Sequence, residues 1–277
     1  MKNRLTSFDA PPVSELLEAA SALRSSGLLP EALGMLTTRR EFDADLCAAR
    51  GGIEFALGRF EDAALSYSAV ALSQPENPDA QYNLALCLQR CGRWDEAAEG
   101  FERVLCLDEY STEARLGLGA CLLEMNRAQD ALECFDAAGR AVGQSPALFG
   151  KAVALQLLGE FDEAAEIYEE LLASAPNSEE VLSNCIAMNI DNHNLAGVRE
   201  HAQRLLELSP HSEVALRGLV TAALEDGNHQ AAVSYCERLL DAAPDCLEAW
   251  HNFRIAMEHY QFGPAETAFA VHSGGKI

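Results

Sequence analysis

Three cysteines come nearest to the spacing of a metal-binding or reactive site in this chain. Cys87 and Cys91 lie four residues apart on one face of an expected helix, and Cys121 follows Cys87 by 34 residues. Three such thiols could hold a soft metal ion, but the sequence has no Cys-x-x-Cys pair of the kind that builds structural zinc sites. The preferred interpretation is therefore that these cysteines are small apolar residues in helix packing.

Other catalytic patterns are also missing from the sequence. It contains no Gly-x-Ser-x-Gly, His-Glu-x-x-His or Gly-Lys-Ser/Thr motif, and Gly117-Leu-Gly119 lacks the third glycine of a nucleotide-binding loop. The 43 acidic residues and seven histidines follow no spacing that singles out an acid–base pair. We therefore expect a protein that is not an enzyme and that needs no cofactor and no metal.

Charge and cysteine usage restrict the partners and the compartment. The formal net charge is −23, which disfavours binding to nucleic acid or to anionic membranes. The nine cysteines are scattered and odd in number, unlike those of a secreted disulfide framework. The sequence shows neither the apolar stretch of a signal peptide nor a run of roughly 18 apolar residues. These features predict a cytoplasmic protein.

One short pattern recurs along the chain, as in LGRFEDAA at 57–64, CGRWDEAA at 91–98 and LGEFDEAA at 158–165. Its second residue returns at intervals of 31 to 34 residues, most of them 34. Repeats of about this length are typical of stacked units that cannot bury their apolar faces alone. The positions concerned are Gly27, Gly58, Gly92, Asn126, Gly159, His193, Gly227 and Gln261.

Each repeat carries the apolar pattern of two helices, expected at about 79–91 and 95–107 in one of them. Gly92 suits a left-handed turn between them, and Asp95 is expected to cap the second helix. Two columns of the second helices are expected in the core, one of small residues and one of aromatic residues. They are Ala63, Ala97, Ala131, Ala164, Val198 and Ala232, and Tyr67, Phe101, Phe135 and Tyr168.

These features resemble the tetratricopeptide repeat, as do the pairs Leu84-Ala85 and Leu118-Gly119 and the prolines that close several repeats. The resemblance covers 13–260, as seven repeats over about 13–246 and a capping helix at 247–260. It implies an all-α fold, a right-handed superhelix (α-solenoid) of antiparallel helix pairs whose first helices line a concave groove. Residues 1–12 and 261–277 are then tails. Pro264 is expected to stop the last helix and leave a flexible C-terminal tail, although docking of that tail stays open.

The resemblance also implies that one stripe of each first helix faces the groove. The stripe mixes aromatic, aliphatic and amide side chains, which suits the binding of a peptide. Its members are Phe55, Tyr82, Asn83, Gln89, Leu116, Phe149, Val153, Gln156, Asn184, Arg217, Thr221, His251 and Asn252. Four glycines on the same side either leave room for a ligand helix or allow close packing. They are Gly52, Gly117, Gly150 and Gly218.

Three asparagines of the stripe, Asn83, Asn184 and Asn252, occupy one column and could hydrogen-bond to a peptide backbone. The column resembles, incompletely, the asparagine ladder of O-GlcNAc transferases. Isolated asparagines on a half-exposed helix face are an equal alternative. Arg217 is the one arginine expected in the stripe, so the basic clamp that holds acidic chaperone tails in related proteins is not expected.

The leading prediction is an adaptor that binds a peptide or helical segment of a partner protein in the groove. The acidic surroundings favour a segment with basic flanks. Two alternatives stay open. One is a self-assembling scaffold whose ends or tails pack into neighbouring protomers, and the other is a non-catalytic accessory subunit of an enzyme complex. A homo-oligomer is compatible with each of them.

Overall fold

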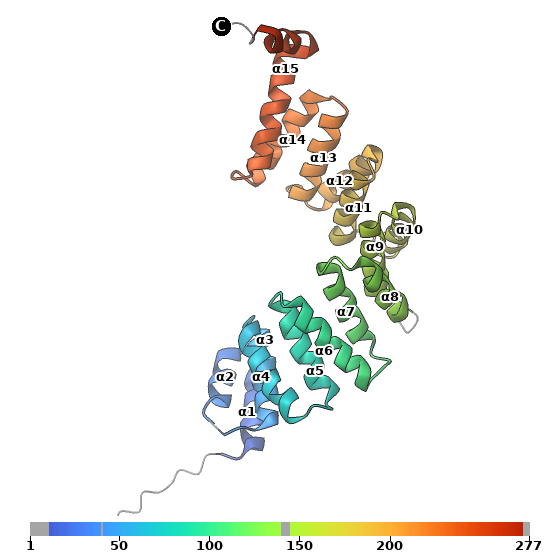
Figure 1. Ribbon diagram of the computed structural model, residues 1–277. Coiled ribbons are helices and arrows are strands. Elements are labelled where there is room, and N and C mark those ends of the chain that lie inside the picture. Colours follow the sequence, from blue (N-terminus) through green and yellow to red (C-terminus); the bar gives the residue numbers. More distant parts are fainter. Residues whose placement is uncertain (1–10, 40, 140–144, 274–277) are drawn as a thin grey trace, which may run out of the picture. The chain divides into compact units, whose positions relative to one another are not determined.

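The structure is a computed structural model that describes residues 11–39, 41–139 and 145–273, with side chains described up to residue 260. Within these ranges it contains fifteen α-helices and no strand, which confirms the all-α prediction (Figure 1). The helices are α1 (Val13–Ser25), α2 (Leu29–Leu36), α3 (Ala44–Ala56), α4 (Phe60–Ser73), α5 (Pro78–Arg90), α6 (Trp94–Leu107), α7 (Thr112–Glu124), α8 (Ala128–Gly139), α9 (Ser145–Leu158), α10 (Phe161–Ser174), α11 (Glu179–Asp191), α12 (Leu195–Leu208), α13 (Glu213–Glu225), α14 (His229–Ala242) and α15 (Leu247–Ser273).

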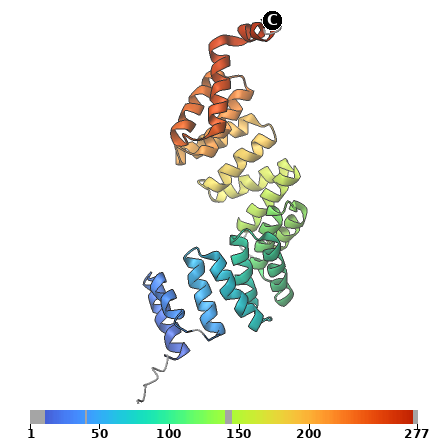
Figure 2. The ribbon, with the colours of Figure 1, turned by 60° about the vertical axis from the view of Figure 1, so that its left-hand side comes forward.

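The chain divides into two compact units, Met1–Gly150 and Lys151–Ile277, with the boundary inside α9. In the first unit, α1 packs on α2, α3 on α4, α5 on α6 and α7 on α8, and each pair packs on the next (Figure 2). In the second unit, α11 packs on α12 and α13 on α14, and α15 covers α14. The odd-numbered helices are the first helices of the repeats and the even-numbered helices are the second. Both units therefore consist of stacked helix pairs, as the sequence predicts.

The turn between the two helices of a repeat is the same in every described case. Gly27, Gly58, Gly92, Gly159 and Gly227 have φ between 69° and 81°, which confirms the expected left-handed turn. In one of these turns, Gly92 N–H donates to Gln89 O and Arg93 N–H donates to Leu88 O, both at 3.0 Å. The last carbonyl groups of the first helix are thereby satisfied. Asn126 and His193 adopt the same conformation with φ of 57° and 53° despite their side chains.

The prediction that Asp95 caps the second helix of its repeat is wrong. Helix α6 begins at Trp94, so Arg93 occupies the N-cap position and Asp95 lies in the first turn, where its charge still faces the positive end of the helix dipole. Side-chain caps are found instead on five first helices and on the second helices α12 and α14, which Asn194 and Asn228 cap. Asp43, for example, accepts a hydrogen bond from Leu46 N–H at 2.9 Å at the start of α3. The other described first-helix caps are Asn77, Ser111, Ser178 and Ser212.

The prediction that Pro264 stops the last helix is also wrong. Helix α15 continues from Leu247 to Ser273, through the eighth turn position at Gln261. A proline inside a helix removes one backbone hydrogen bond and tends to bend the helix, without necessarily ending it. Figure 2 shows α15 bending towards its C-terminal end. The expected flexible tail is therefore helical in backbone up to Ser273, and residues 274–277 lie outside the described residues.

The two core columns are confirmed. Every member of the small column is fully buried, and Phe101, Phe135 and Tyr168 are at most 4% exposed. A small residue on the second helix lets the two helices of a repeat approach closely. An aromatic ring one turn later then fills the space towards the next repeat. This alternation of small and large residues sets the spacing of the stack.

Two repeats carry polar groups at core positions where other repeats are mostly apolar. Glu54 is 6% exposed and accepts a hydrogen bond from Ser66 Oγ at 2.5 Å, while Arg50 Nε donates to the same hydroxyl at 2.9 Å. The equivalent pair four repeats later is Asn189 and His201, both buried. A ring nitrogen of His201, Nδ1, lies 2.8 Å from Gly197 O. The position of Glu54 and Asn189 is held elsewhere by Leu88, Leu122, Leu155 and Ala223.

Candidate peptide-binding surface

The predicted groove residues all lie on first helices, and they are divided between the two units. The first unit holds Phe55 on α3, Tyr82, Asn83 and Gln89 on α5, Leu116 on α7 and Phe149 on α9. The second unit holds Val153 and Gln156 on α9, Asn184 on α11, Arg217 and Thr221 on α13, and His251 and Asn252 on α15.

In the first unit, Phe55 belongs to an aromatic cluster that spans two repeats. Its ring meets the ring of Phe60 edge to face, with centroids 5.2 Å apart. The guanidinium carbon of Arg90, from α5, lies 5.7 Å from the centroid of Phe55 and 6.0 Å from that of Phe60. A cation over an aromatic face is stabilising by roughly 0.5–1 kcal/mol at an exposed site. Sequence reasoning did not select Phe60 and Arg90 because their contact crosses from one repeat to the next.

Tyr82 provides a second half-buried aromatic side chain on the same helix as Arg90. Its ring meets Phe101 edge to face, with centroids 5.7 Å apart. Burial raises the pKa of the Tyr82 hydroxyl, and the nearby carboxylate of Glu113 raises it further. The hydroxyl therefore stays protonated at neutral pH and is available as a hydrogen-bond donor.

Gln89 also lies half-buried on α5, and it reaches the next repeat. Its side chain hydrogen-bonds to the thiol of Cys121 on α7, which partly opposes the effect of burial on that thiol's pKa. Asn83 and Phe149 are half-buried as well. The first unit thus offers aromatic and amide side chains that are partly accessible and held in place by neighbouring repeats.

A further hollow between α1 and α3 was not predicted. It measures about 220 Å³ and is lined by Leu17, Ala20, Ser21, Arg24, Ala49 and Ile53. Its lining is largely apolar, and Arg24 adds a positive charge. The first repeat departs from the pattern of the others, so no binding residue on α1 could be predicted from the repeat pattern. Arg24 and Arg90 show that basic groups on the first helices are not limited to Arg217.

In the second unit, the polar side chains of the stripe are engaged with their own chain. Gln156 Nε2 donates to Asp191 Oδ2 at 3.3 Å, and Gln156 Oε1 accepts from the Tyr168 hydroxyl at 3.1 Å. Asn184 Nδ2 donates to Glu180 O of its own helix at 3.0 Å. One of the two amide hydrogens of Asn184 is thereby used, which leaves its carbonyl oxygen and second hydrogen for a ligand.

Arg217 is held between acidic side chains. Its Nη1 lies 3.0 Å from Glu248 Oε2, and its Nη2 lies 3.7 Å from Glu213 Oε2. Thr221 Oγ1 donates to the carbonyl of Arg217 at 3.1 Å. His251 is exposed, and Val153 and Asn252 are half-buried. Because two carboxylates already balance the guanidinium, this part of the stripe carries no excess positive charge.

The glycines that were expected to leave room for a ligand mostly accommodate the protein's own side chains. A Cβ on Gly117 would lie 2.6 Å from Phe101 Cε1, and one on Gly150 would lie 2.5 Å from Phe135 Cζ. A Cβ on Gly218 would lie 2.7 Å from Ile186 Cγ2, and one on Gly52 would lie 3.3 Å from the Tyr67 hydroxyl oxygen. Close packing between repeats therefore explains Gly117, Gly150 and Gly218, and the alternative of space for a ligand helix is wrong at these three positions. Gly52 packs less tightly and contacts a side chain of its own repeat.

All nine cysteines are free thiols. Burial raises the pKa of Cys87 to about 12, with smaller contributions from Cys91 and Glu54. Burial also raises the pKa of Cys121 to about 11. A neutral buried thiol is a poor nucleophile and a poor metal ligand. Within the described residues, no three histidine, cysteine or acidic side chains are grouped as a metal site would require.

Among the described helices, none combines the length and the apolar character needed to cross a bilayer. The cytoplasmic location stays a prediction.

Two models of the tetratricopeptide repeat family match the chain, one at residues 49–114 and 122–179 and the other at residues 92–150 and 189–254. No curated protein matches the sequence. Among solved structures, a tetratricopeptide repeat protein from Parabacteroides merdae is similar with a TM-score of 0.71 and 16% identity, covering 88% of this chain and 98% of that one.

Two further structures share the same helix-pair architecture. PilW, described as a widely conserved type IV pilus biogenesis factor, has a TM-score of 0.68 and 20% identity over 75% of this chain and 97% of its own. YrrB, described as a TPR protein with an unusual peptide-binding site, has a TM-score of 0.54 and 17% identity over 68% of this chain and 97% of its own. At identities this low, the structural similarity shows a common fold only. The function of this chain has to be inferred from its own residues.

Proposed function

Because the chain belongs to the tetratricopeptide repeat family, we propose that it is a non-catalytic adaptor that binds a peptide or helical segment of a partner protein on its first helices. Proteins of this family generally mediate protein–protein interactions. The proposed contacts in the first unit are Tyr82, Asn83 and Phe149, and those in the second unit are Asn184 and Arg217. An accessory subunit of an enzyme complex would use the same surface and differ only in its partner.

The observation that carries this proposal is the half-buried aromatic and amide surface of α3 and α5. Tyr82 and Phe55 are each fixed by an edge-to-face ring contact, and Arg90 lies over the ring of Phe55. Side chains that are already ordered lose little conformational entropy on binding, which favours their use as anchors. The net charge of −23 favours partners with basic flanks.

A self-assembling scaffold is the second candidate, and the exposed apolar side chains of α15 favour it. Leu247 is 84% exposed and Trp250 is 52% exposed on this last helix. These side chains differ from the polar outer face that the capping helix of a repeat array is expected to have. Exposed apolar side chains on a terminal repeat favour contact with a second molecule, because that contact would bury them.

The experiment that tests the proposal is a crosslinked pull-down from a native lysate with two variants, Tyr82→Ala/Asn83→Ala in the first unit and Asn184→Ala/Arg217→Ala in the second. The captured proteins are identified by mass spectrometry, and circular dichroism verifies that each variant keeps its helicity. A partner captured by the parent and lost by one variant supports the proposal and shows which unit binds.

The matched control is Tyr110→Ala, which removes a highly exposed tyrosine from the connection after α6 and should leave capture unchanged. If every variant captures the same proteins as the parent, the first helices do not form the binding surface. If the chain captures only itself, and Trp250→Ala abolishes that capture, the scaffold replaces the adaptor.

A further inference from the structure

The outer face of α4 differs from the outer faces of the later second helices. Leu65 is 71% exposed, and Leu72 lies two helical turns further along the same face and is 80% exposed. The position of Leu65 is held by Glu99, Glu133, Glu166, Glu200 and Ser234 in α6, α8, α10, α12 and α14, all of them exposed. Folding does not require leucine at this position, because the same fold is built with glutamate there.

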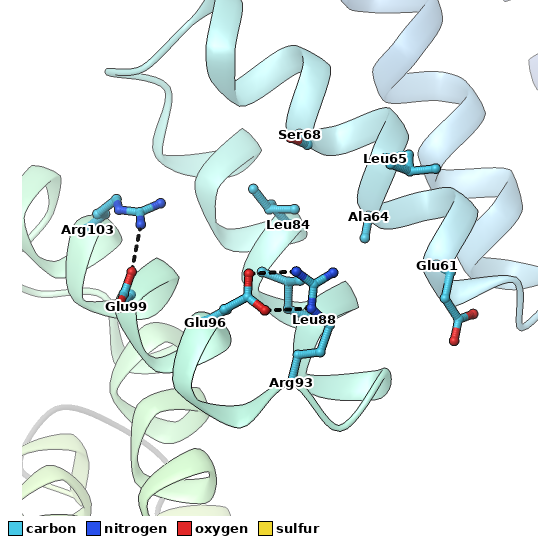
Figure 3. Close-up of a pocket in the computed structure, with 10 residues that line it drawn as sticks. All are labelled: Glu61, Ala64, Leu65, Ser68, Leu84, Leu88, Arg93, Glu96, Glu99 and Arg103. Atoms are coloured by element: carbon cyan, nitrogen blue, oxygen red, sulfur yellow. Dashed lines mark hydrogen bonds and ion pairs between the residues drawn. The ribbon is translucent and has the colours of Figure 1, made fainter.

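Leu65 lies beside a groove between α4 and α6. The groove has a volume of about 410 Å³, and its floor is formed by α5. Figure 3 shows Leu84 of α5 between Ala64 of α4 on one side and the Arg103–Glu99 pair of α6 on the other. Leu84 and Leu88 make the floor apolar. We call this groove, together with Leu65 and Leu72, the α4–α6 groove.

The charges around the α4–α6 groove leave a negative excess. On α6, Arg93 Nη2 pairs with Glu96 Oε2 at 2.6 Å and Arg103 Nη2 pairs with Glu99 Oε2 at 3.1 Å, so these four charges balance. Across the groove, Glu61 on α4 has no ion-pair partner among the described residues, so one carboxylate in the lining is left unbalanced. The net charge of −23 adds to the negative field.

We propose that the α4–α6 groove is a second protein-binding site, which takes an amphipathic helix with a leucine-rich face and basic flanking residues. Leucines two turns apart on α4 match the spacing of apolar residues along one face of an incoming helix. The unpaired carboxylate of Glu61, together with the net negative charge of the chain, favours lysine or arginine beside that face. A second copy of this chain, with its own charge of −23, is disfavoured by like-charge repulsion.

This site is separate from the surface of the proposed function. It lies between second helices, whereas the proposed adaptor surface lies on first helices. The two proposals can therefore fail independently, and variants in one site serve as controls for the other.

The test uses the full chain and a synthetic 18-residue helical peptide with leucines at positions i, i+3, i+4 and i+7 and with lysines and alanines elsewhere. Fluorescence anisotropy measures its binding to the parent and to Leu65→Glu/Leu72→Glu. We expect binding to the variant to be at least tenfold weaker, because two leucines no longer bury apolar area. The variant also gains two negative charges, so purely electrostatic binding of a basic peptide would become tighter.

The matched control is Leu157→Glu/Leu208→Glu, which makes the same chemical change at two exposed leucines of the second unit. It should bind the peptide as the parent does. Equal binding by the parent and Leu65→Glu/Leu72→Glu would overturn the proposal. So would a parent that dimerises in analytical ultracentrifugation through a contact abolished by this variant, since a second copy would then occupy the groove.

Discussion

The ring of Phe101 occupies the space that a side chain on Gly117 would need. Phe101 projects from α6 and is 1% exposed, and two of its ring carbons would lie 2.6 and 2.7 Å from a Cβ on Gly117 of α7. Real Cβ atoms do not approach carbon atoms so closely. The same relationship holds between Phe135 of α8 and Gly150 of α9. Neighbouring repeats in the first unit are thus joined by an aromatic ring set against a glycine.

Gly117→Ala should destabilise the protein although alanine is the better helix former. Overpacking a core typically costs about 1–3 kcal/mol, which exceeds the gain of about 1 kcal/mol in helix propensity. Urea unfolding followed by circular dichroism measures the difference. The control is Gly34→Ala in α2, where a Cβ would meet no atom within 4 Å. That variant should gain up to about 1 kcal/mol, and equal effects of the two changes would refute the account.

His193→Gly should stabilise the turn between α11 and α12. His193 has φ of 53°, a conformation that costs a residue with a side chain roughly 1–2 kcal/mol and glycine almost nothing. The greater freedom of glycine in the unfolded chain offsets part of this gain, so we expect a net increase of about 0.5–1 kcal/mol. The reverse change Gly159→Ala, at φ of 81°, should destabilise by a similar amount. Thermal unfolding of both variants checks the opposite signs.

The repeat architecture could be predicted from the sequence because it depends on local rules repeated many times. A turn residue every 34 positions, the small column and the aromatic column each have a direct physical role, and the structure confirms all three. The role of Gly117 could not be decided in the same way. A glycine on a helix face leaves space, and only the position of Phe101 shows that the protein itself fills that space.

The buried carboxylate of Glu54 leads to a prediction about its hydrogen-bond partner. Ser66→Ala removes the hydroxyl that donates to Glu54 at 2.5 Å and should destabilise by about 1–3 kcal/mol, because the carboxylate stays buried with one donor fewer. Adding Glu54→Leu to Ser66→Ala should recover part of this loss, since the double variant removes the carboxylate together with its donor and places at position 54 the apolar residue found there in the next three repeats. Urea unfolding of Ser66→Ala and of the double variant tests this. A double variant less stable than Ser66→Ala would contradict it.

Alkaline pH should destabilise the fold through its buried thiols. Cys87 has a folded pKa of about 12 against an ordinary value of 9.0, and burial likewise raises the pKa of Cys185 to about 12. Below pH 9 these thiols are neutral in both states. Between pH 9 and about 12 the unfolded chain releases their protons and the folded chain retains them, so stability falls by up to about 1.4 kcal/mol per pH unit for each thiol.

The measurement compares urea unfolding at pH 8 and pH 10 for the parent and for Cys87→Ala. At pH 8 the variant is expected to have a lower free energy of unfolding than the parent, because a buried side chain is shortened. Between pH 8 and pH 10 it should lose less stability than the parent. Alkylation at pH 8 provides an independent check. Exposed Cys106 should react readily in the folded protein, while Cys87 and Cys185 should react only after unfolding. An identical pH dependence in parent and variant would refute the assignment to Cys87.

The parts of the candidate surface that escaped prediction depend on contacts between repeats. Arg90 was not selected, because its placement over Phe55 joins side chains of two neighbouring repeats. Arg217 was expected as a free basic contact, but Glu213 and Glu248 lie within 4 Å of it. Sequence spacing determines which face of a helix a residue occupies, whereas its charge balance depends on neighbours from other helices.

The pairing of Glu54 with Ser66 has a consequence for how a chain of similar repeats assembles. If α3 paired with the second helix of one of the next three repeats, Glu54 would face Gly100, Cys134 or Ile167, and none of these supplies a hydroxyl. A mispaired intermediate would then hold the carboxylate without its hydroxyl donor, at the same cost of about 1–3 kcal/mol as Ser66→Ala. A chain of similar repeats thereby distinguishes its second repeat from the three that follow, and out-of-register pairing of α3 is penalised.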